Sequence, residues 1–393
     1  MKQGKDSSAA QVRSGLRVLI AAGGTGGHVY PAIAIAQRVR SRHPQAEILF
    51  VGTRDRIEAQ VVPAAGFRVA FITVKGLAAT RSVVQRLKAG LWLAAGVPLW
   101  QSLLLLRRFR PDVVVGAGGF VCGPVLVGAW LTRTPSLAVE QNEIPGLTTR
   151  VAARLVSAAA VVSDGCRNRY LALLGRRAER VRVEVVGTPV RGEIISTSRE
   201  DAARALGIDP SRLALLVFGG SIGSLPVNRA FVGALEILAR WPALREVEIV
   251  HITGRENVAY LDEARARELG LRYHVFEYRH DMHNALAAAD IVVSRAGGST
   301  LAEITARGLA PIIVPWAGAA EGHQEQNAAP LEASGAAVVI RDAELTAQRL
   351  ADEIWRLVSD PAARDELARR SSAMGRLGAA DAVVDMIEDL ARG

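Results

Sequence analysis

The chain has 393 residues, of which 50% are hydrophobic and 22% are charged, so we expect a packed protein of two domains and exclude a disordered chain. A net charge of +9 and a pI near 10.2 favour an anionic partner: a phosphorylated ligand, an anionic membrane surface or nucleic acid. Nucleic acid is disfavoured, because the sequence has no run of five basic residues and no aromatic–basic RNA-binding pattern. The only cysteines, Cys122 and Cys166, are far apart, which excludes a disulfide framework and favours a reducing compartment.

The first half of the chain repeats a short apolar strand, a turn and an amphipathic helix. Residues 1–15 are polar and lack the apolar stretch of a signal peptide, so we expect a flexible tail there. The strands that follow are predicted at Leu16–Ala21, Glu47–Val51, Arg68–Ile72, Asp112–Gly116, Ser136–Val139, Ala158–Val162 and Arg182–Val186. This alternation predicts an α/β domain with a doubly wound parallel sheet.

One uncharged segment, Ala89–Leu106, interrupts this pattern and has basic residues on both sides. Gly96 and Pro98 lie inside it, so a helix that spans a membrane is not expected. We expect a helix or helix pair whose apolar face and basic flanks rest on an anionic leaflet. A fully buried helix is the alternative.

The second half of the chain starts the same pattern again. Strands are predicted near Leu213, Glu246, Tyr273, Ala289, Ala310 and Ala336, and three helices follow Ala343. Glycines and prolines cluster in "VVGTPVRGEI", Val185–Ile194, which places the domain boundary there. Two doubly wound domains joined at this point would form a cleft between the carboxyl ends of their sheets.

A glycine loop follows the first strand in "VLIAAGGTGGHVYPA", Val18–Ala32. It lacks both the third glycine of the dinucleotide fingerprint, where Val29 stands, and the lysine of a Walker A loop. What remains is a helix N-terminus that suits an anion, with His28 at its start. His28 is the candidate general base, and a histidine that only bonds backbone is the alternative.

Three more glycine loops follow predicted strands: "GAGGFVCGP" at Gly116–Pro124, "FGGSIGS" at Phe218–Ser224 and "SRAGGSTLAE" at Ser294–Glu303. Together they predict a cleft for phosphates. Glu303 is then placed to accept hydrogen bonds from ribose hydroxyls, unless it is only stabilised by the helix dipole. Arg191 is a candidate for a charge-assisted bond to the diphosphate.

No metal and no cofactor are expected. The sequence contains no D-x-D, and the only closely spaced histidines, His280 and His283, have no further ligands nearby. The diphosphate charge would have to be neutralised by backbone N–H groups and arginine.

Seven motifs, in this order, resemble those of the MurG family of bacterial UDP-N-acetylglucosamine:lipid I glycosyltransferases: "GGTGGHVYPA", "GAGGFVCGP", "EQNEIPGLTTR", "VVGTPVR", "FGGSIGS", "SRAGGSTLAE" and "HQEQNA". The resemblance runs from about Arg17 to the C-terminus. It implies a GT-B fold and transfer of GlcNAc, with inversion, from UDP-GlcNAc to the 4-hydroxyl of MurNAc in undecaprenyl-linked lipid I. It also implies a peripheral position on the inner leaflet, at the cytoplasmic face of the cell inner membrane.

The resemblance divides the chain into an acceptor and membrane-facing domain (16–190), a UDP-GlcNAc-binding domain (191–375) and a last helix (376–393) that packs back on the first domain. His28 corresponds to the histidine that activates or positions the acceptor. Ser221 and Arg191 are implied to face the diphosphate, Arg279 the uracil through its main chain, Glu303 the ribose and Gln324 the sugar. The full implied donor set is Thr25, Gly26, Gly27, Asn142, Arg191, Ser221, Arg279, Gly298, Ser299, Thr300, Leu301, Ala302, Glu303 and Gln324.

Some positions depart from the family's pattern, and other functions stay open. Phe120 stands where relatives often carry tyrosine, and Thr188 stands where asparagine is usual. If His28 is not the base, Asn142 and Glu140 are the next candidates. A UDP-GlcNAc 2-epimerase of the same fold and a non-catalytic binder of anionic surfaces are the alternative functions.

Overall fold

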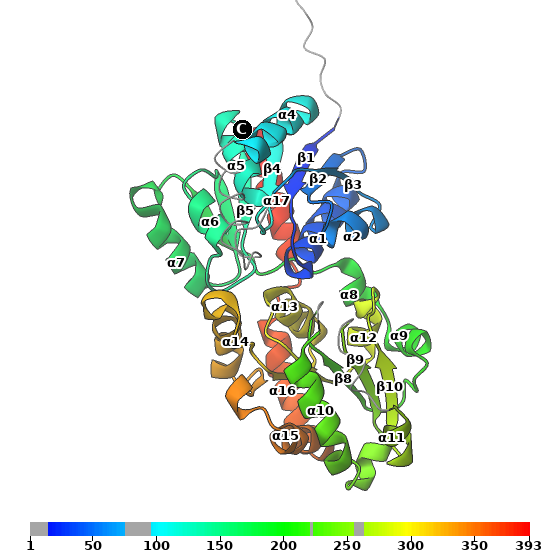
Figure 1. Cartoon of the computed structure of the whole chain (residues 1–393). Coiled ribbons are helices and arrows are strands. Elements are labelled where there is room, and N and C mark those ends of the chain that lie inside the picture. Colours follow the sequence, from blue (N-terminus) through cyan, green and yellow to red (C-terminus); the bar gives the residue numbers. More distant parts are fainter. Residues whose placement is uncertain (1–14, 75–95, 221–222, 255–262) are drawn as a thin grey trace, which may run out of the picture.

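The computed structural model describes residues 15–74, 96–220, 223–254 and 263–393. They form two α/β domains, one above the other in Figure 1, and each domain is built on its own parallel sheet. The prediction of two doubly wound sheets is therefore confirmed, and each strand begins within two residues of a predicted one.

The first domain has a seven-stranded parallel sheet in the order β3-β2-β1-β4-β5-β6-β7. Its strands are β1 (Arg17–Ala21), β2 (Glu47–Gly52), β3 (Arg68–Phe71), β4 (Val113–Gly116), β5 (Ser136–Val139), β6 (Ala158–Val161) and β7 (Arg182–Val185). The α-helices among the described residues of this domain are α1 (Gly26–Arg42), α2 (Glu58–Ala64), α4 (Val97–Phe109), α5 (Cys122–Leu131), α6 (Leu147–Ala152) and α7 (Asp164–Leu174).

Strand β1 lies inside the sheet: it is apolar after Arg17, and it pairs with β2 on one side and β4 on the other. In the registers of β1 with β2 and with β4, Ile20 lies beside Phe50 and Val115. All three side chains are buried in one cluster, as expected for a parallel sheet covered on both faces. The strand order reverses between β1 and β4, so the loops that follow these parallel strands diverge and leave a crevice at their carboxyl ends.

The second domain has a six-stranded parallel sheet in the order β10-β9-β8-β11-β12-β13. Its strands are β8 (Ala214–Phe218), β9 (Glu248–Ile252), β10 (Arg272–Phe276), β11 (Ile291–Ser294), β12 (Ala310–Ile313) and β13 (Val338–Val339). The helices are α8 (Gly192–Ser196), α9 (Arg199–Leu206), α10 (Leu225–Leu238), α11 (Glu263–Glu268), α12 (Met282–Ala288), α13 (Gly298–Arg307), α14 (His323–Ala333), α15 (Ala347–Ser359) and α16 (Pro361–Met374). The equivalent crevice lies between β8 and β11.

The last helix, α17 (Ala379–Arg392), leaves the second domain and packs against α1 of the first (Figure 1). Val383 and Ile387 lie fully buried in the core of the first domain. On the outer side of the helix, Asp381 and Asp385 pair with Arg42. The chain therefore crosses between the domains twice, before α8 and after α16.

The structure also places Glu303 and most of the uncharged segment Ala89–Leu106. Glu303 lies in the second turn of α13, because the helix begins at Gly298. Of the segment Ala89–Leu106, residues 89–95 lie outside the described residues, and the rest belongs largely to α4. Among the described residues, no helix is long and apolar enough to cross a membrane.

Candidate functional site

A cavity of about 500 Å³ lies between the two domains, at the carboxyl ends of β8, β9 and β11. Among the described residues, the first domain contributes only the start of α1, and the second domain contributes the loops after its strands. The cavity is lined by Thr25, Gly26, Gly27, Tyr30, Phe218, Gly219, Gly220, Gly223, Ser224, Leu225, Pro226, Ile252, Gly254, Tyr278, Arg279, Met282, Arg295, Gly297, Ser299, Thr300, Glu303, Trp316 and Gln324.

Two helices point their N-termini at this cavity. Helix α1 follows Thr25 and helix α13 follows Gly297; neither cap makes a side-chain hydrogen bond, and neither first turn holds an acidic residue. The two ends are close, because a Cβ on Gly27 would lie 3.7 Å from the hydroxyl of Ser299. Backbone N–H groups of a first turn have no helical partner, and the helix dipole favours negative charge there. The cavity therefore suits an anion such as a diphosphate.

A buried carboxylate forms part of the wall of the cavity. Glu303 has a side chain 15% exposed and lies 3.4 Å from the guanidinium of Arg191, which stacks over the ring of Tyr30 at 4.3 Å. Burial raises the pKa of Glu303, and the charge of Arg191 opposes this shift. Arg191 does not line the cavity but lies behind Glu303 and Tyr30, so its contact with a diphosphate stays a prediction. What it does in the structure is hold the carboxylate in place.

Two predicted donor residues have their side chains fixed by the second domain. The Oε1 atom of Gln324 accepts hydrogen bonds from the backbone N–H groups of Ala296 (3.1 Å) and Trp316 (2.9 Å), so its NH₂ group is the end that can bond a ligand. The guanidinium of Arg279 is paired with Asp281 and holds the pKa of that carboxyl at about 2. Because its guanidinium is paired with Asp281, the groups that Arg279 presents for a ligand at the cavity wall are its backbone N–H and C=O.

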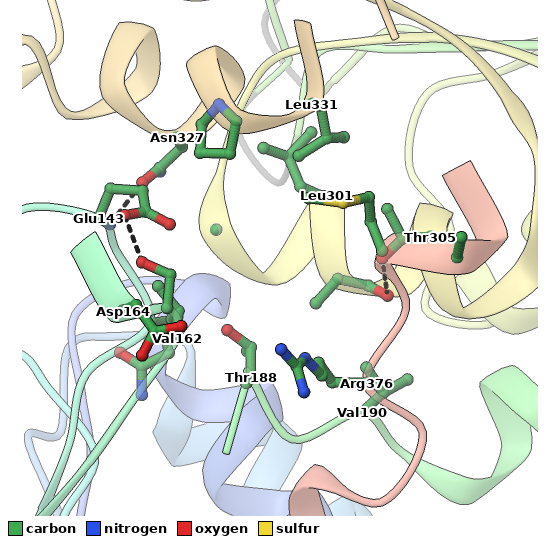
Figure 2. A pocket seen from close by; sticks show the side chains of 18 residues that line it. Glu143, Val162, Asp164, Thr188, Val190, Leu301, Thr305, Asn327, Leu331 and Arg376 are labelled. Carbon is green, nitrogen blue, oxygen red and sulfur yellow. Dashed lines mark hydrogen bonds between the residues drawn. The ribbon is translucent and has the colours of Figure 1, made fainter. Parts of the chain in front are cut away.

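The next predicted residues do not line this cavity. Gly298, Leu301 and Ala302 line a second pocket of about 230 Å³ on the other face of α13. Glu143 and Asn327 lie on one side of that pocket, and Leu301 lies on the other (Figure 2). Ser221 lies outside the described residues.

The predicted donor residue Asn142 lies at a seam between the domains. Its Oδ1 atom accepts a hydrogen bond from the amide of Asn327 at 3.1 Å. The Oδ1 atom of Asn327 in turn accepts from the backbone N–H of Glu143 at 2.9 Å, as the dashed line in Figure 2 marks. A ligand contact by Asn142 stays a prediction, and its observed partners connect the two domains.

His28 lies beside the second glycine loop of the first domain. Its Nδ1 atom is 3.2 Å from Oε1 of Gln141. Gly118 has a φ of +102°, and a Cβ on it would lie 2.2 Å from the same Nδ1 atom, so only glycine allows this approach. The histidine is thus held at the crevice between β1 and β4, next to the cavity but not in its lining.

Two buried carboxylates hold the loops around His28. Glu58 accepts hydrogen bonds from the backbone N–H groups of Gly24 and Thr53. Glu140, the alternative base, accepts from the backbone N–H groups of Asn142 and Gly146. Glu140 is buried and engaged in its own loop, which favours a structural role over proton transfer.

Sequence reasoning missed several residues of the site. Tyr30, Tyr278, Arg295 and Trp316 line the cavity, although no sequence pattern marks them individually as ligand contacts. Tyr30 and Arg295 lie within two of the glycine loops described above, whereas Tyr278 and Trp316 lie outside them. The signal that could have identified them is position alone: each follows a glycine loop or a parallel strand at the carboxyl end of a sheet.

An apolar surface lies on the first domain, away from the cavity. Helices α4 and α5 pack together, and α4 lies at the end of that domain farthest from the second (Figure 1). Trp100 and Leu104 on α4, and Trp130 and Leu131 on α5, are exposed. Basic residues at the end of α4, Arg107 and Arg108, are exposed beside them. We call these four apolar residues the α4–α5 apolar surface.

Both domains of the chain match a known glycosyltransferase family, and curated relatives match it over nearly its whole length. Residues 18–161 match the glycosyltransferase family 28 N-terminal domain, and residues 214–386 match its C-terminal domain. A UDP-N-acetylglucosamine–N-acetylmuramyl-(pentapeptide) pyrophosphoryl-undecaprenol N-acetylglucosamine transferase of Desulforudis audaxviator is 41% identical, over 96% of this chain and 99% of its own. The protein of the same name from Moorella thermoacetica is 39% identical, over 95% and 98%.

Solved structures with the same fold include two with different names. The crystal structure of Acinetobacter baumannii MurG matches with a TM-score of 0.70 and 23% identity, over 95% of this chain and 99% of that one. UDP-GlcNAc 2-epimerase from Neisseria meningitidis bound to UDP-GlcNAc matches with a TM-score of 0.67 and 14% identity, over 95% and 100%. At these identities the likeness shows the fold alone.

Proposed function

The chain belongs to glycosyltransferase family 28, and from this membership we propose that it transfers N-acetylglucosamine from UDP-GlcNAc to lipid I. The acceptor is the N-acetylmuramyl-pentapeptide carried on undecaprenyl diphosphate, and the products are lipid II and UDP. The observation that carries the proposal is the interdomain cavity with two uncapped helix N-termini and a buried carboxylate on its wall. Its chemistry suits a nucleoside diphosphate.

We assign the UDP-GlcNAc donor to this cavity, where loops of the second domain form most of the wall. The backbone N–H groups at Thr25–Gly27 and Gly298–Thr300 would hold the diphosphate, together with Ser221. Glu303 would accept hydrogen bonds from the ribose, and the backbone of Arg279 would bond the uracil. Gln324 would donate its NH₂ group to the sugar, which its fixed Oε1 atom supports. Asn142, Arg191, Leu301 and Ala302 complete the proposed set from positions behind the cavity wall.

The chemical step would be a single displacement with inversion at the anomeric carbon. The 4-hydroxyl of MurNAc loses its proton to His28 and forms the new bond to C1 of GlcNAc. The bond from C1 to the β-phosphate oxygen breaks, and UDP leaves with that electron pair. The helix N-termini stabilise the charge that develops on the leaving diphosphate, so the step needs no metal ion.

Turnover of radiolabelled UDP-GlcNAc with a lipid I analogue tests this function. We expect UDP release that requires the acceptor and survives EDTA. Release that depends on added metal would contradict the mechanism, and conversion of UDP-GlcNAc without an acceptor would indicate an epimerase instead. His28→Ala should lose most of kcat, by about 10²-fold or more, while the affinity for UDP-GlcNAc stays nearly unchanged.

We also propose that the α4–α5 apolar surface docks on the inner leaflet, at the cytoplasmic face of the inner membrane. Exposed tryptophans and leucines beside Arg107 and Arg108 support this, since such surfaces bind anionic interfaces. Sedimentation with phosphatidylglycerol vesicles should retain the protein. Trp100→Ser with Leu104→Ser should release it without changing its affinity for UDP-GlcNAc in solution, and unchanged sedimentation would refute the docking surface.

A further inference from the structure

We propose that Gln141 is a positioning residue that holds the imidazole of His28 in one tautomer, with the proton on Nδ1 and the lone pair on Nε2. The inference deepens the proposed function and rests on it, because it assigns the atom of His28 that takes the acceptor's proton. It concerns a residue with no part in the donor cavity.

The orientation of the Gln141 amide follows from a fixed acceptor. Gln141 is only 3% exposed, and its Nε2 atom lies 2.9 Å from the backbone oxygen of Ala117. A carbonyl oxygen only accepts, so the NH₂ end must point at Ala117; the flipped amide would place two oxygens against each other. Oε1 is therefore the end that faces His28.

The tautomer of His28 follows from the same chain of hydrogen bonds. Oε1 of Gln141 is 3.2 Å from Nδ1 of His28, and an amide oxygen only accepts. Nδ1 must therefore carry a proton, so in the neutral ring the lone pair is on Nε2. A general base needs this lone pair to take the proton of a hydroxyl group.

The carbonyl that starts the chain of hydrogen bonds is itself held firmly. Ala117 follows β4, and its backbone N–H donates to the oxygen of Ala21 at 2.8 Å. The next residue, Gly118, touches the imidazole and donates its N–H to the sulfur of Cys122 at 3.1 Å. Backbone on one side and Gln141 on the other thus hold the ring.

The partner that orients the ring is neutral, although titratable groups lie nearby. Glu58 and Glu140 accept hydrogen bonds from the backbone of their own loops. The thiol of Cys122 is buried, which raises its pKa to about 12 and keeps it protonated. A carboxylate in place of Gln141 would add a negative charge beside the ring, whereas an amide fixes the tautomer without one.

Nitrogen NMR of protein labelled with ¹⁵N-histidine tests the tautomer directly and does not depend on transferase activity. The signals of His28 are identified by their loss in His28→Asn. At pH 8 we expect a protonated Nδ1 and an unprotonated Nε2 in the wild type, and a shift toward the opposite tautomer in Gln141→Met. A protonated Nε2 in the wild type, or an unchanged pattern in the variant, would overturn the proposal.

Kinetics separate positioning from a general structural effect. Gln141→Met should lower kcat by between about 10-fold and about 100-fold, with the KM for UDP-GlcNAc within about twofold of wild type. Gln141→Glu keeps an acceptor for Nδ1 but places a carboxylate oxygen against the backbone oxygen of Ala117, so it should retain the wild-type tautomer and recover only part of kcat. Gln141→Leu, which also removes the acceptor, replaces the first variant if that one fails to fold. The matched control is Gln348→Met, on the exposed face of α15. Equal kcat in Gln141→Met, Gln141→Glu and the wild type would refute a positioning role.

If the wild type proves inactive with lipid I while the NMR tautomers are as expected, the proposed function fails and the role of Gln141 stands. If transfer is normal and the tautomer does not respond to Gln141, the proposed function stands and this inference fails.

Discussion

A buried histidine in the second domain should make its folding sensitive to acid. His251 lies in β9 and is fully buried. Its Nε2 atom is 3.0 Å from Oδ1 of Asn228, whose amide donates to the backbone oxygen of Thr253, and its Nδ1 atom is 2.7 Å from the hydroxyl of Tyr273. The amide orientation makes Nε2 the donor and Nδ1 the acceptor. Burial lowers the pKa of His251 to about 3, from an ordinary value of 6.5.

The sign of the effect follows from which state binds the proton. Above pH 6.5 the histidine is neutral in both states, and no difference arises. Between pH 6.5 and about pH 3, His251 is protonated in the unfolded chain but stays neutral in the folded chain. The free energy of unfolding therefore falls as the pH is lowered through this window. One pKa unit corresponds to about 1.4 kcal/mol, so at pH 4.5 the loss due to His251 is about 3 kcal/mol.

Urea unfolding at pH 7.5 and pH 4.5, followed by tryptophan fluorescence, measures this loss. The stacked pair Trp241 and Trp355 reports on the second domain. His251→Gln should lose about 3 kcal/mol less than the wild type between the two pH values, and His280→Gln, at an exposed position, is the control for removing a histidine. A wild-type loss that matches His251→Gln to within about 0.5 kcal/mol would refute the reasoning, since surface substitutions vary by that much.

Three further predictions concern the site. Glu303→Gln should weaken UDP-GlcNAc binding by about 10-fold or more in calorimetry, because a charge-assisted bond to the ribose is lost. Unchanged affinity would show that Glu303 pairs with Arg191 without contacting the ribose. Gly298→Ala should lower kcat/KM by at least about 10-fold, because its Cβ would lie 2.0 Å from the backbone oxygen of Gln141 and push the domains apart. Wild-type kinetics in this variant would show that the contact between the domains adjusts without affecting the reaction. Cys122, despite its place at the start of α5, should react with a thiol reagent at pH 8 only after unfolding, because burial raises its pKa to about 12; labelling of the folded protein would contradict its burial.

Most of the fold could be predicted because its signals are local. Strands β1 and β8 are short apolar runs buried on both faces, and glycine turns mark their ends. The partner of α17 could not be derived in this way. The apolar face of α17 must pack against another element, but the sequence pattern does not say which domain provides that element. Only the family resemblance indicated the first domain.

The site was predictable where backbone geometry makes it. Glycine loops after parallel strands, with the order reversal of doubly wound sheets, bring the starts of α1 and α13 together. Side chains that reach the cavity from a distance gave no such signal. Tyr30 stands one turn into α1, in the pattern of a core residue, and its place is explained by its contacts with Arg191 and Tyr278 across the domain boundary.

One tetrapeptide, Glu140–Glu143, connects the proposed base to the donor helix. Glu140 fixes the loop, Gln141 orients His28 through its side chain, and the backbone oxygen of Gln141 abuts Gly298 at the start of α13. The seam with Asn327 closes directly beside it. Because α13 carries backbone N–H groups proposed to hold the diphosphate, this contact helps to set the distance between donor and base. A change at the seam should therefore alter kcat even when each substrate still binds.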